Sequence, residues 1–127
     1  MDRKTIKKAD RERAYRKYDG HCAYCGKVIA YKDMQVDHLV PLEGYSKKGT
    51  NDFDNLMPSC RRCNHYKRAN SLEGWRRMLE SIPKRLERDS YIYRVALDYG
   101  LIEPRPHKVQ FYFEKEREQN GKINPQK

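Results

Sequence analysis

Two Cys-x-x-Cys pairs frame the middle of the chain: CAYCGK occupies residues 22–27 and CRRCN occupies residues 60–64. Two such pairs provide four thiolates, the ligand set that zinc prefers in tetrahedral structural sites. Two redox-active pairs, or unrelated buried thiols, are the alternatives. The first residues are charged and form no apolar leader, so we expect a cytoplasmic chain whose thiols stay reduced, which favours metal binding. The predicted ligands of a structural zinc ion are Cys22, Cys25, Cys60 and Cys63.

The segment between the two pairs, residues 26–59, is expected to hold the chemistry. A zinc ion with four thiolate ligands has no open position for water, so it would not be catalytic. The spacer is longer than the roughly 15–20 residues of simple zinc ribbons, which implies that something has been built between the pairs. A thiol oxidoreductase is disfavoured because its Cys-x-x-Cys would be expected near a βαβ pattern.

Composition indicates one small, basic domain. The chain has 127 residues, and its 37% hydrophobic and 36% charged residues predict a thin core that a metal would help to stabilise. Lys and Arg number 28 against 18 Asp and Glu, which gives a formal charge of +10. Such a charge is typical of nucleic-acid-binding proteins, although a merely solvated basic surface gives the same count. No run of about 20 apolar residues is present, so no membrane association is expected.

Local patterns predict a basic helix followed by a core at residues 20–70. Residues 1–19 are expected to form the helix, with Asp19 and Gly20 as its stop signal. In the core, VIAY at 28–31 and MQVDHLV at 34–40 resemble two short strands around a turn, and residues 43–54 resemble a surface loop.

The C-terminal half is predicted to be a helical extension, residues 71–114, that ends in a short strand. The chain is expected to turn helical after Asn64, with a capped amphipathic helix after Asn70 and a second helix from Pro83 to Tyr99. Gly100 would be the left-handed cap of that helix. KVQFYFEKE at 108–116 alternates as a half-buried strand does, and residues 115–127 are expected to be a polar tail.

The residues Asp37 and His38 offer the chemistry of phosphodiester hydrolysis. That reaction needs a base to deprotonate water and a divalent metal ion to neutralise charge on the phosphate. His38 is a candidate base because the imidazole group as a class titrates near neutrality, and Asp37 is a hard oxygen ligand suited to Mg²⁺ or Mn²⁺. Neighbours in a strand point to opposite faces, so both can serve one phosphate only near a strand end. Taken alone, the dipeptide equally fits a structural histidine.

The surrounding pattern resembles the HNH endonuclease family in its Cys-knuckled form. The matching residues are CAYCG, VDHLVPL, GTNDFDNL, CRRCN and the trailing Lys67, in that order, over about residues 22–67. Residues 72–114 are similar to the C-terminal extensions of small standalone HNH proteins of phages and prophages. The resemblance implies an α+β fold with a ββα-metal core, in which a two-stranded hairpin packs on a helix and a metal lies between them.

The resemblance also implies roles for individual residues. His38 falls on the general base and Asp37 on an acidic metal ligand. Asn55 falls on the Asn that braces the loop carrying the base, with an ordinary turn Asn as the alternative. The final family position is Asn64 here and not His, which resembles the HNH domains of RNA-guided CRISPR nucleases, and an amide oxygen can still coordinate Mg²⁺. His65 is the competing ligand or a phosphate contact.

The function expected from these features is metal-dependent cleavage of DNA, with double-stranded DNA as the substrate. Mg²⁺ or Mn²⁺ would be the catalytic ion, and a single ion should leave a nick. The basic flanks could select a DNA site, form a homodimer or dock on phage packaging components. The alternative is a non-catalytic zinc module that binds nucleic acid. The residues expected to meet the DNA backbone, or else to form a solvated basic turn, are Arg61, Arg62, Lys67 and Arg68.

Overall fold

The structure is a computed structural model that describes residues 6–44 and 47–123. The first five residues of the expected basic helix and the last four of the expected tail lie outside this range. The chain divides into two compact units. We call residues 1–72 with 110–127 the core unit and residues 73–109 the helical unit. Whether the two fold as the single domain predicted from the sequence stays a prediction.

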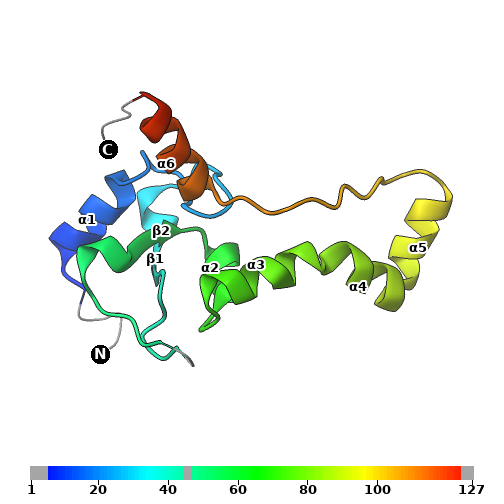
Figure 1. The fold of residues 1–127 in the computed structure, drawn as a ribbon, viewed down its shortest axis with the longest axis horizontal. Coiled ribbons are helices and arrows are strands. Elements are labelled where there is room, and N and C mark those ends of the chain that lie inside the picture. The colour runs from blue at the N-terminus through cyan, green and yellow to red at the C-terminus, as the bar shows by residue number, and fades with distance from the viewer. Residues whose placement is uncertain (1–5, 45–46, 124–127) are drawn as a thin grey trace. The chain divides into compact units, whose positions relative to one another are not determined.

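The core unit is built on a two-stranded antiparallel sheet (Figure 1). Strand β1, Gln35–His38, pairs with β2, Leu56–Ser59, so that Gln35 lies opposite Ser59 and His38 opposite Leu56. The α+β class is confirmed. β1 ends at His38, which places the Asp37–His38 pair at a strand end as the sequence predicts.

The expected strand at residues 28–31 is wrong. Val28 forms only an isolated bridge with His21, and Tyr31–Asp33 is the 3-10 helix η2. The backbone here bonds to the first Cys pair instead: Cys22 N donates to Lys27 O, and Ile29 N donates to Gly20 O. Because these groups close the Cys turn, they are not available to pair with β1.

The partner of β1 is β2, a segment that the sequence analysis did not assign to a strand. β2 contains Pro58, which has no N–H and therefore weakens any sequence signal for a strand. Its carbonyl oxygen accepts a hydrogen bond of 2.8 Å from Ala23 N. The first Cys turn is thus bonded to the outer edge of the sheet. The 3-10 helix η3, Phe53–Asn55, leads into β2.

Helix α1, Lys8–Arg16, braces the sheet. The predicted stop is confirmed, since Asp19 and Gly20 both have positive φ, 53° and 79°. Lys17 follows the helix, and its Nζ donates to Phe53 O at 3.1 Å and to Leu56 O at 2.8 Å. Arg11 likewise donates to backbone carbonyls before β1. Part of the basic charge of the N-terminal segment is therefore used inside the fold.

Helix α2, Arg61–Lys67, begins at the second Cys pair and not after Asn64 as expected. Cys60 is its N-cap, and the Cys60 sulfur accepts from Cys63 N at 3.4 Å. A sulfur atom that also serves as a metal ligand can therefore fix where the helix starts. α2 packs against β1 (Figure 1).

The predicted strand at residues 108–116 is a helix start. Helix α6 runs over Tyr112–Ile123, so the tail expected to be irregular is helical as far as residue 123. The first N–H groups of a helix need acceptors outside it, and here Tyr112 N donates to Tyr24 O and Phe113 N to Ala23 O. Phe111 and Phe113 are buried against the Tyr24 ring. Their alternation therefore reflects a helix entry, which a short pattern cannot distinguish from a strand.

The helical unit contains the helices α3, α4 and α5, which span Leu72–Glu80, Ile82–Asp89 and Tyr91–Asp98. The single helix expected from Pro83 to Tyr99 is wrong, because Ser90 has extended φ and ψ and its Oγ accepts from Tyr93 N at 3.2 Å. Gly100 has the predicted positive φ, 67°. Leu86 of α4 is 38% exposed.

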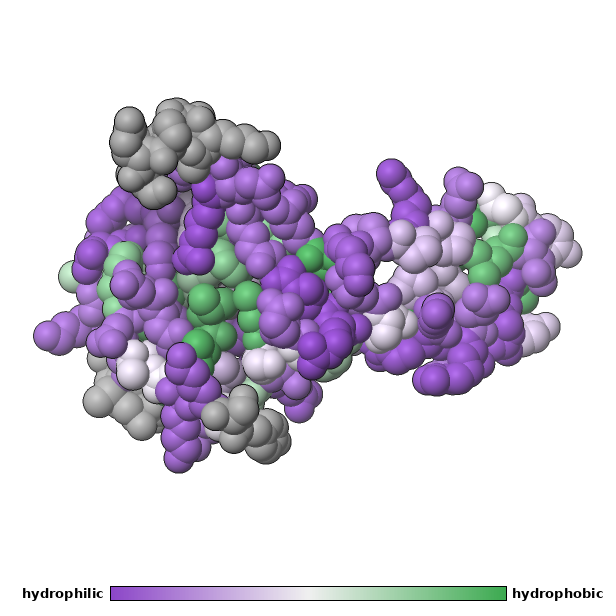
Figure 2. Space-filling model, viewed as in Figure 1, coloured by the Kyte–Doolittle hydropathy of each residue, from purple (hydrophilic) through white to green (hydrophobic). Residues whose placement is uncertain are grey.

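Hydrophobic residues reach the surface of the helical unit (Figure 2). Its exposed large apolar side chains include Leu86, Tyr91, Ile92, Tyr99 and Leu101. Within the described part of the chain, every helix is too short or too polar to cross a bilayer.

Candidate functional site

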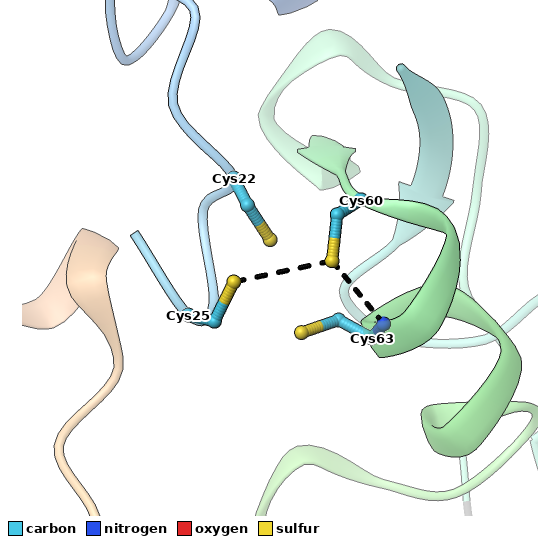
Figure 3. Close-up of side chains that lie close together, drawn as sticks. All are labelled: Cys22, Cys25, Cys60 and Cys63. Carbon is cyan, nitrogen blue, oxygen red and sulfur yellow. Dashed lines mark hydrogen bonds between the residues drawn. The ribbon is translucent and has the colours of Figure 1, made fainter. Parts of the chain in front are cut away.

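The four cysteines converge, as the sequence predicts. Their sulfur atoms all lie within 4.8 Å of one another, and the Cys25 and Cys60 sulfurs are 3.9 Å apart (Figure 3). A tetrahedral zinc site with bonds of about 2.3 Å has sulfur–sulfur edges of about 3.8 Å. The four sulfurs therefore fit a structural zinc ion. Two lie on the turn after α1 and two at the start of α2, so the ion would join these segments.

The electrostatics of the cluster favour a cation. A hydrogen bond from Cys63 lowers the pKa of Cys22 to about 4, and the same bond raises the pKa of Cys63. Burial raises the pKa of Cys25. The Cys22 thiolate is thus stable while Cys25 and Cys63 stay protonated, and a divalent cation is needed to hold four negative sulfurs so close together.

The contact between β1 and α2 pairs two residues from each element. Gln35 and Asp37 are two apart on the strand and share a face, and Asn64 and Lys67 are three apart on the helix and also share one. Asn64 Nδ2 donates to Gln35 Oε1 at 2.6 Å. Lys67 Nζ lies 3.1 Å from Asp37 Oδ2. Strand and helix are thereby fixed in register by two polar contacts.

Asp37 is a buried carboxylate with two strong donors. Besides Lys67, its Oδ2 accepts from Tyr24 Oη at 2.6 Å, and only 1% of the Asp37 surface is exposed. Burial, and then the charge of Asp37, raises the pKa of Tyr24. Because Tyr24 lies between Cys22 and Cys25, the turn that carries the first Cys pair is directly linked to the carboxylate of Asp37.

Lys67 is a structural residue and not a DNA contact. Its side chain is fully buried, and its Nζ also donates to His38 O at 2.9 Å. The prediction that Lys67 meets the DNA backbone is therefore wrong. The other three predicted contacts, Arg61, Arg62 and Arg68, are exposed. The sequence alone does not separate Lys67 from the neighbouring arginines, because burial depends on which face of the helix a residue occupies. Lys67 lies three positions after Asn64 and therefore shares its face.

The side-chain oxygen of Asn64 is a candidate metal ligand. Its Oδ1 is buried and accepts no hydrogen bond from the described part of the protein, while its Nδ2 is held by Gln35. A buried oxygen without a donor costs free energy unless something binds it. A divalent cation fits this atom, since Mg²⁺ and Mn²⁺ prefer carboxylate and amide oxygens. His65, the competing ligand, is exposed and lines a hollow with Lys27, Arg61 and Arg62.

His38 is held by a residue that the sequence did not single out. His38 Nε2 lies 2.6 Å from Asn51 Oδ1. An amide oxygen only accepts hydrogen bonds, so Nε2 is the donor, and in the neutral imidazole this puts the lone pair on Nδ1. The His38 side chain is 3% exposed. The only sequence signal for Asn51 was its place in the GTNDFDNL motif.

Asn55 closes the loop that follows His38. Its Oδ1 accepts from Val40 N at 2.8 Å, and its Nδ2 donates to Val40 O at 2.9 Å and to Thr50 O at 2.8 Å. At Gly49, an added Cβ would lie 1.8 Å from Val40 O and 2.8 Å from Asn55 Nδ2. Only glycine fits there. The side chain of Asn55 therefore braces both ends of the loop.

The family comparison agrees with this geometry. Residues 22–70 match the family model described as HNH endonuclease. This chain carries an HNH endonuclease domain. The domain includes both Cys pairs, β1, β2 and α2.

The HNH domain is similar to parts of much larger proteins. It is 44% identical over 46 residues to the CRISPR-associated endonuclease Cas9 of Corynebacterium diphtheriae, covering 36% of this chain and 4% of that protein. For Cas9 of Actinomyces naeslundii the identity is 39% over 54 residues, 42% of this chain and 5% of the relative. The crystal structure of that Type II-C Cas9 covers 60% of this chain and 8% of its own, with a TM-score of 0.48 and 31% identity.

A smaller relative is YoqL, an SPbeta prophage-derived protein of Bacillus subtilis whose name describes it as an HNH endonuclease. It is 32% identical over 63 residues, covering 46% of this chain and 27% of YoqL. This chain thus spans between 4% and 27% of the length of these curated relatives. The family model itself is matched by residues 22–70.

Proposed function

We propose that this protein is a metal-dependent DNA endonuclease that uses His38 to activate water for phosphodiester hydrolysis. The observation that carries the proposal is the buried Oδ1 of Asn64, which accepts no hydrogen bond from residues 6–44 or 47–123 and lies on the helix face that packs against Asp37. A domain of the HNH endonuclease family that keeps an oxygen ligand pair and a histidine in this arrangement is suited to nuclease chemistry. We propose double-stranded DNA in the cytoplasm as the substrate.

Asp37 and Asn64 would hold the catalytic ion. Mg²⁺ or Mn²⁺, when bound, would neutralise charge on the scissile phosphate and on the departing oxygen. Asp37 is kept in position by Tyr24 and Lys67, and Asn64 is kept in position by Gln35. Both ligands are thus supported by neighbours that leave little freedom to rotate, which lowers the cost of binding an ion.

His38 would take the proton from the attacking water. Its Nε2–H is held by Asn51, which leaves the Nδ1 lone pair to accept that proton. The Asn55 bonds to Val40 fix the backbone two residues beyond His38. The base is therefore oriented on both its ring and its backbone.

The test is the conversion of supercoiled plasmid to open-circle or linear DNA in added Mg²⁺ or Mn²⁺. We expect cleavage by the wild-type protein and a loss of at least about 10²-fold in the His38→Ala variant, the usual contribution of a general base. His107→Ala is the matched control, because His107 is an exposed histidine of the helical unit. The nicked-to-linear ratio reports whether one strand or both are cut.

Binding of DNA without cleavage in either metal would contradict the proposal and favour a non-catalytic zinc module. Equal activity of the wild type and the His38→Ala variant would contradict the role of His38. Zinc content must be compared between the two proteins, so that loss of the fold is not mistaken for loss of the base.

A further inference from the structure

A basic hollow lies beside the zinc cluster. It has a volume of about 520 Å³ and is lined by Lys27, Arg61, Arg62 and His65. Lys27 comes two residues after the first Cys pair, and the other three lie on α2. His65 is four residues after Arg61 and three after Arg62, so the three project from one side of the helix. Two segments that the sulfurs bring together thus build one cationic surface.

The cations of this hollow are not used by the fold. All four side chains are exposed, and within the described residues none of them forms an ion pair or a side-chain hydrogen bond. Arg11 and Lys17 differ, since their cationic groups donate to backbone carbonyls of the core unit. Four cationic side chains that line one hollow repel one another, and a bound anion would relieve that repulsion.

We propose that Lys27, Arg61, Arg62 and His65 bind the phosphate backbone of the nucleic acid that the active site cleaves. This site rests on the proposed function for its ligand, which is DNA. Guanidinium groups suit phosphate because their planar fork donates two hydrogen bonds to it. Lys27 is far from the other three residues in the sequence and joins them only in the folded chain. In this proposal His65 binds phosphate and not the metal ion.

The hollow and the residues that contact β1 lie on different sides of α2. Asn64 and Lys67 face β1, whereas Arg61, Arg62 and His65 face the hollow. A helix with its side chains is about 10–12 Å wide, and one strand of DNA carries one phosphate for about every 3.4 Å of axis. The hollow would therefore contact phosphates about three nucleotides from the one that is cut.

Lys27 is the residue to test. It is exposed, so its substitution should not disturb the core, whereas Arg61 and Arg62 lie between two zinc ligands. Lys27→Gln removes one charge from the hollow, and Lys27→Arg keeps it. Lys84→Gln is the matched control, because Lys84 is exposed on α4 and loses the same charge elsewhere.

The measurement is the affinity for a DNA duplex at several salt concentrations, made in the His38→Ala background so that the DNA stays intact. The slope of log affinity against log salt reports the number of phosphates neutralised. We expect Lys27→Gln to reduce this slope by about 0.9, the value for one phosphate contact, and Lys27→Arg to restore it. Lys84→Gln should leave the slope unchanged.

An unchanged slope in Lys27→Gln, or an equal reduction in Lys84→Gln, would overturn the site. Loss of zinc from Lys27→Gln would overturn it too, because the charge would then serve the zinc–thiolate cluster. The proposed function is tested separately: plasmid cleavage with an unchanged slope would refute the hollow alone, and a reduced slope without cleavage would refute the nuclease and leave the backbone site standing.

Discussion

Lys67 and Asp37 form a buried ion pair across the contact between α2 and β1, with 3.1 Å between Nζ and Oδ2 and at most 1% of either side chain exposed. Tyr24 links Asp37 to the turn that carries the first Cys pair, and Lys67 donates to the backbone oxygen of His38 at the end of β1. An ion pair so deeply buried is retained only when its remaining polar atoms are bonded, and both partners have further bonds here. The ion pair therefore joins α2, β1 and the first Cys turn within the HNH domain.

Substituting Lys67 alone should be costly. Lys67→Met would leave Asp37 as a buried charge without its cation, and we expect the free energy of unfolding to fall by about 3–5 kcal/mol. Asp37→Asn combined with Lys67→Met should lose less than Lys67→Met alone, because no buried charge is left. Urea unfolding of both proteins measures this, with the exposed Lys84→Met as control. A loss below about 1 kcal/mol in Lys67→Met would show that the pair is solvated.

Tyr24 should connect the turn that carries the first Cys pair to the proposed catalytic site at Asp37. Tyr24→Phe removes the hydrogen bond to Asp37 and should lower the free energy of unfolding by about 1.5–3 kcal/mol, the range for a bond to a charged group. Tyr15→Phe is the control, since the Tyr15 hydroxyl donates to the neutral Ile29 O. Only Tyr24→Phe should also slow plasmid cleavage, with zinc content unchanged. Equal cleavage by both variants would separate Tyr24 from the active site.

Asn51 should act as a positioning residue for His38. Asn51→Ala removes the acceptor for Nε2–H, and we expect cleavage to slow by about tenfold or more, a part of the usual 10²–10⁴ of general-base catalysis. Asn51→Asp keeps an acceptor in the same place and should retain most of the activity that Asn51→Ala loses. Single-turnover cleavage with saturating protein measures the difference. If both variants cleave equally slowly, an acceptor at position 51 is not what His38 requires.

The Cys cluster should bind one zinc ion per chain. Cys60→Ala removes both a ligand and the N-cap of α2, so we expect loss of bound zinc together with a lower melting temperature and reduced helical circular dichroism. Ser90→Ala, which removes the N-cap of α5, is the control for loss of a cap without loss of a ligand. Zinc retained at one ion per chain in Cys60→Ala would refute the four-cysteine site.

Much of the site was readable from sequence because its signals are local. The spacing within each Cys pair predicted the sulfur cluster, and Gly100 and the Asp19–Gly20 stop adopt the expected left-handed backbone. The predicted strand end at His38 was also found. In each case the residue type and its immediate neighbours limit the backbone to few conformations, so no distant contact is needed.

Other features were decided only by tertiary structure. The partner of β1 proved to be β2, about twenty residues away and containing a proline, because pairing depends on which edges the Cys turn leaves open. The Phe111–Phe113 alternation became a helix start because carbonyls of residues 23 and 24 accept its first N–H groups. Lys67 is buried and Arg61 is exposed within one helix, since only Lys67 faces a carboxylate thirty residues earlier in the chain. Residue types and their immediate neighbours thus specify which chemical groups are present and where the backbone turns. Strand pairing, burial and counter-charge arise from contacts between distant segments, so only the folded chain defines them.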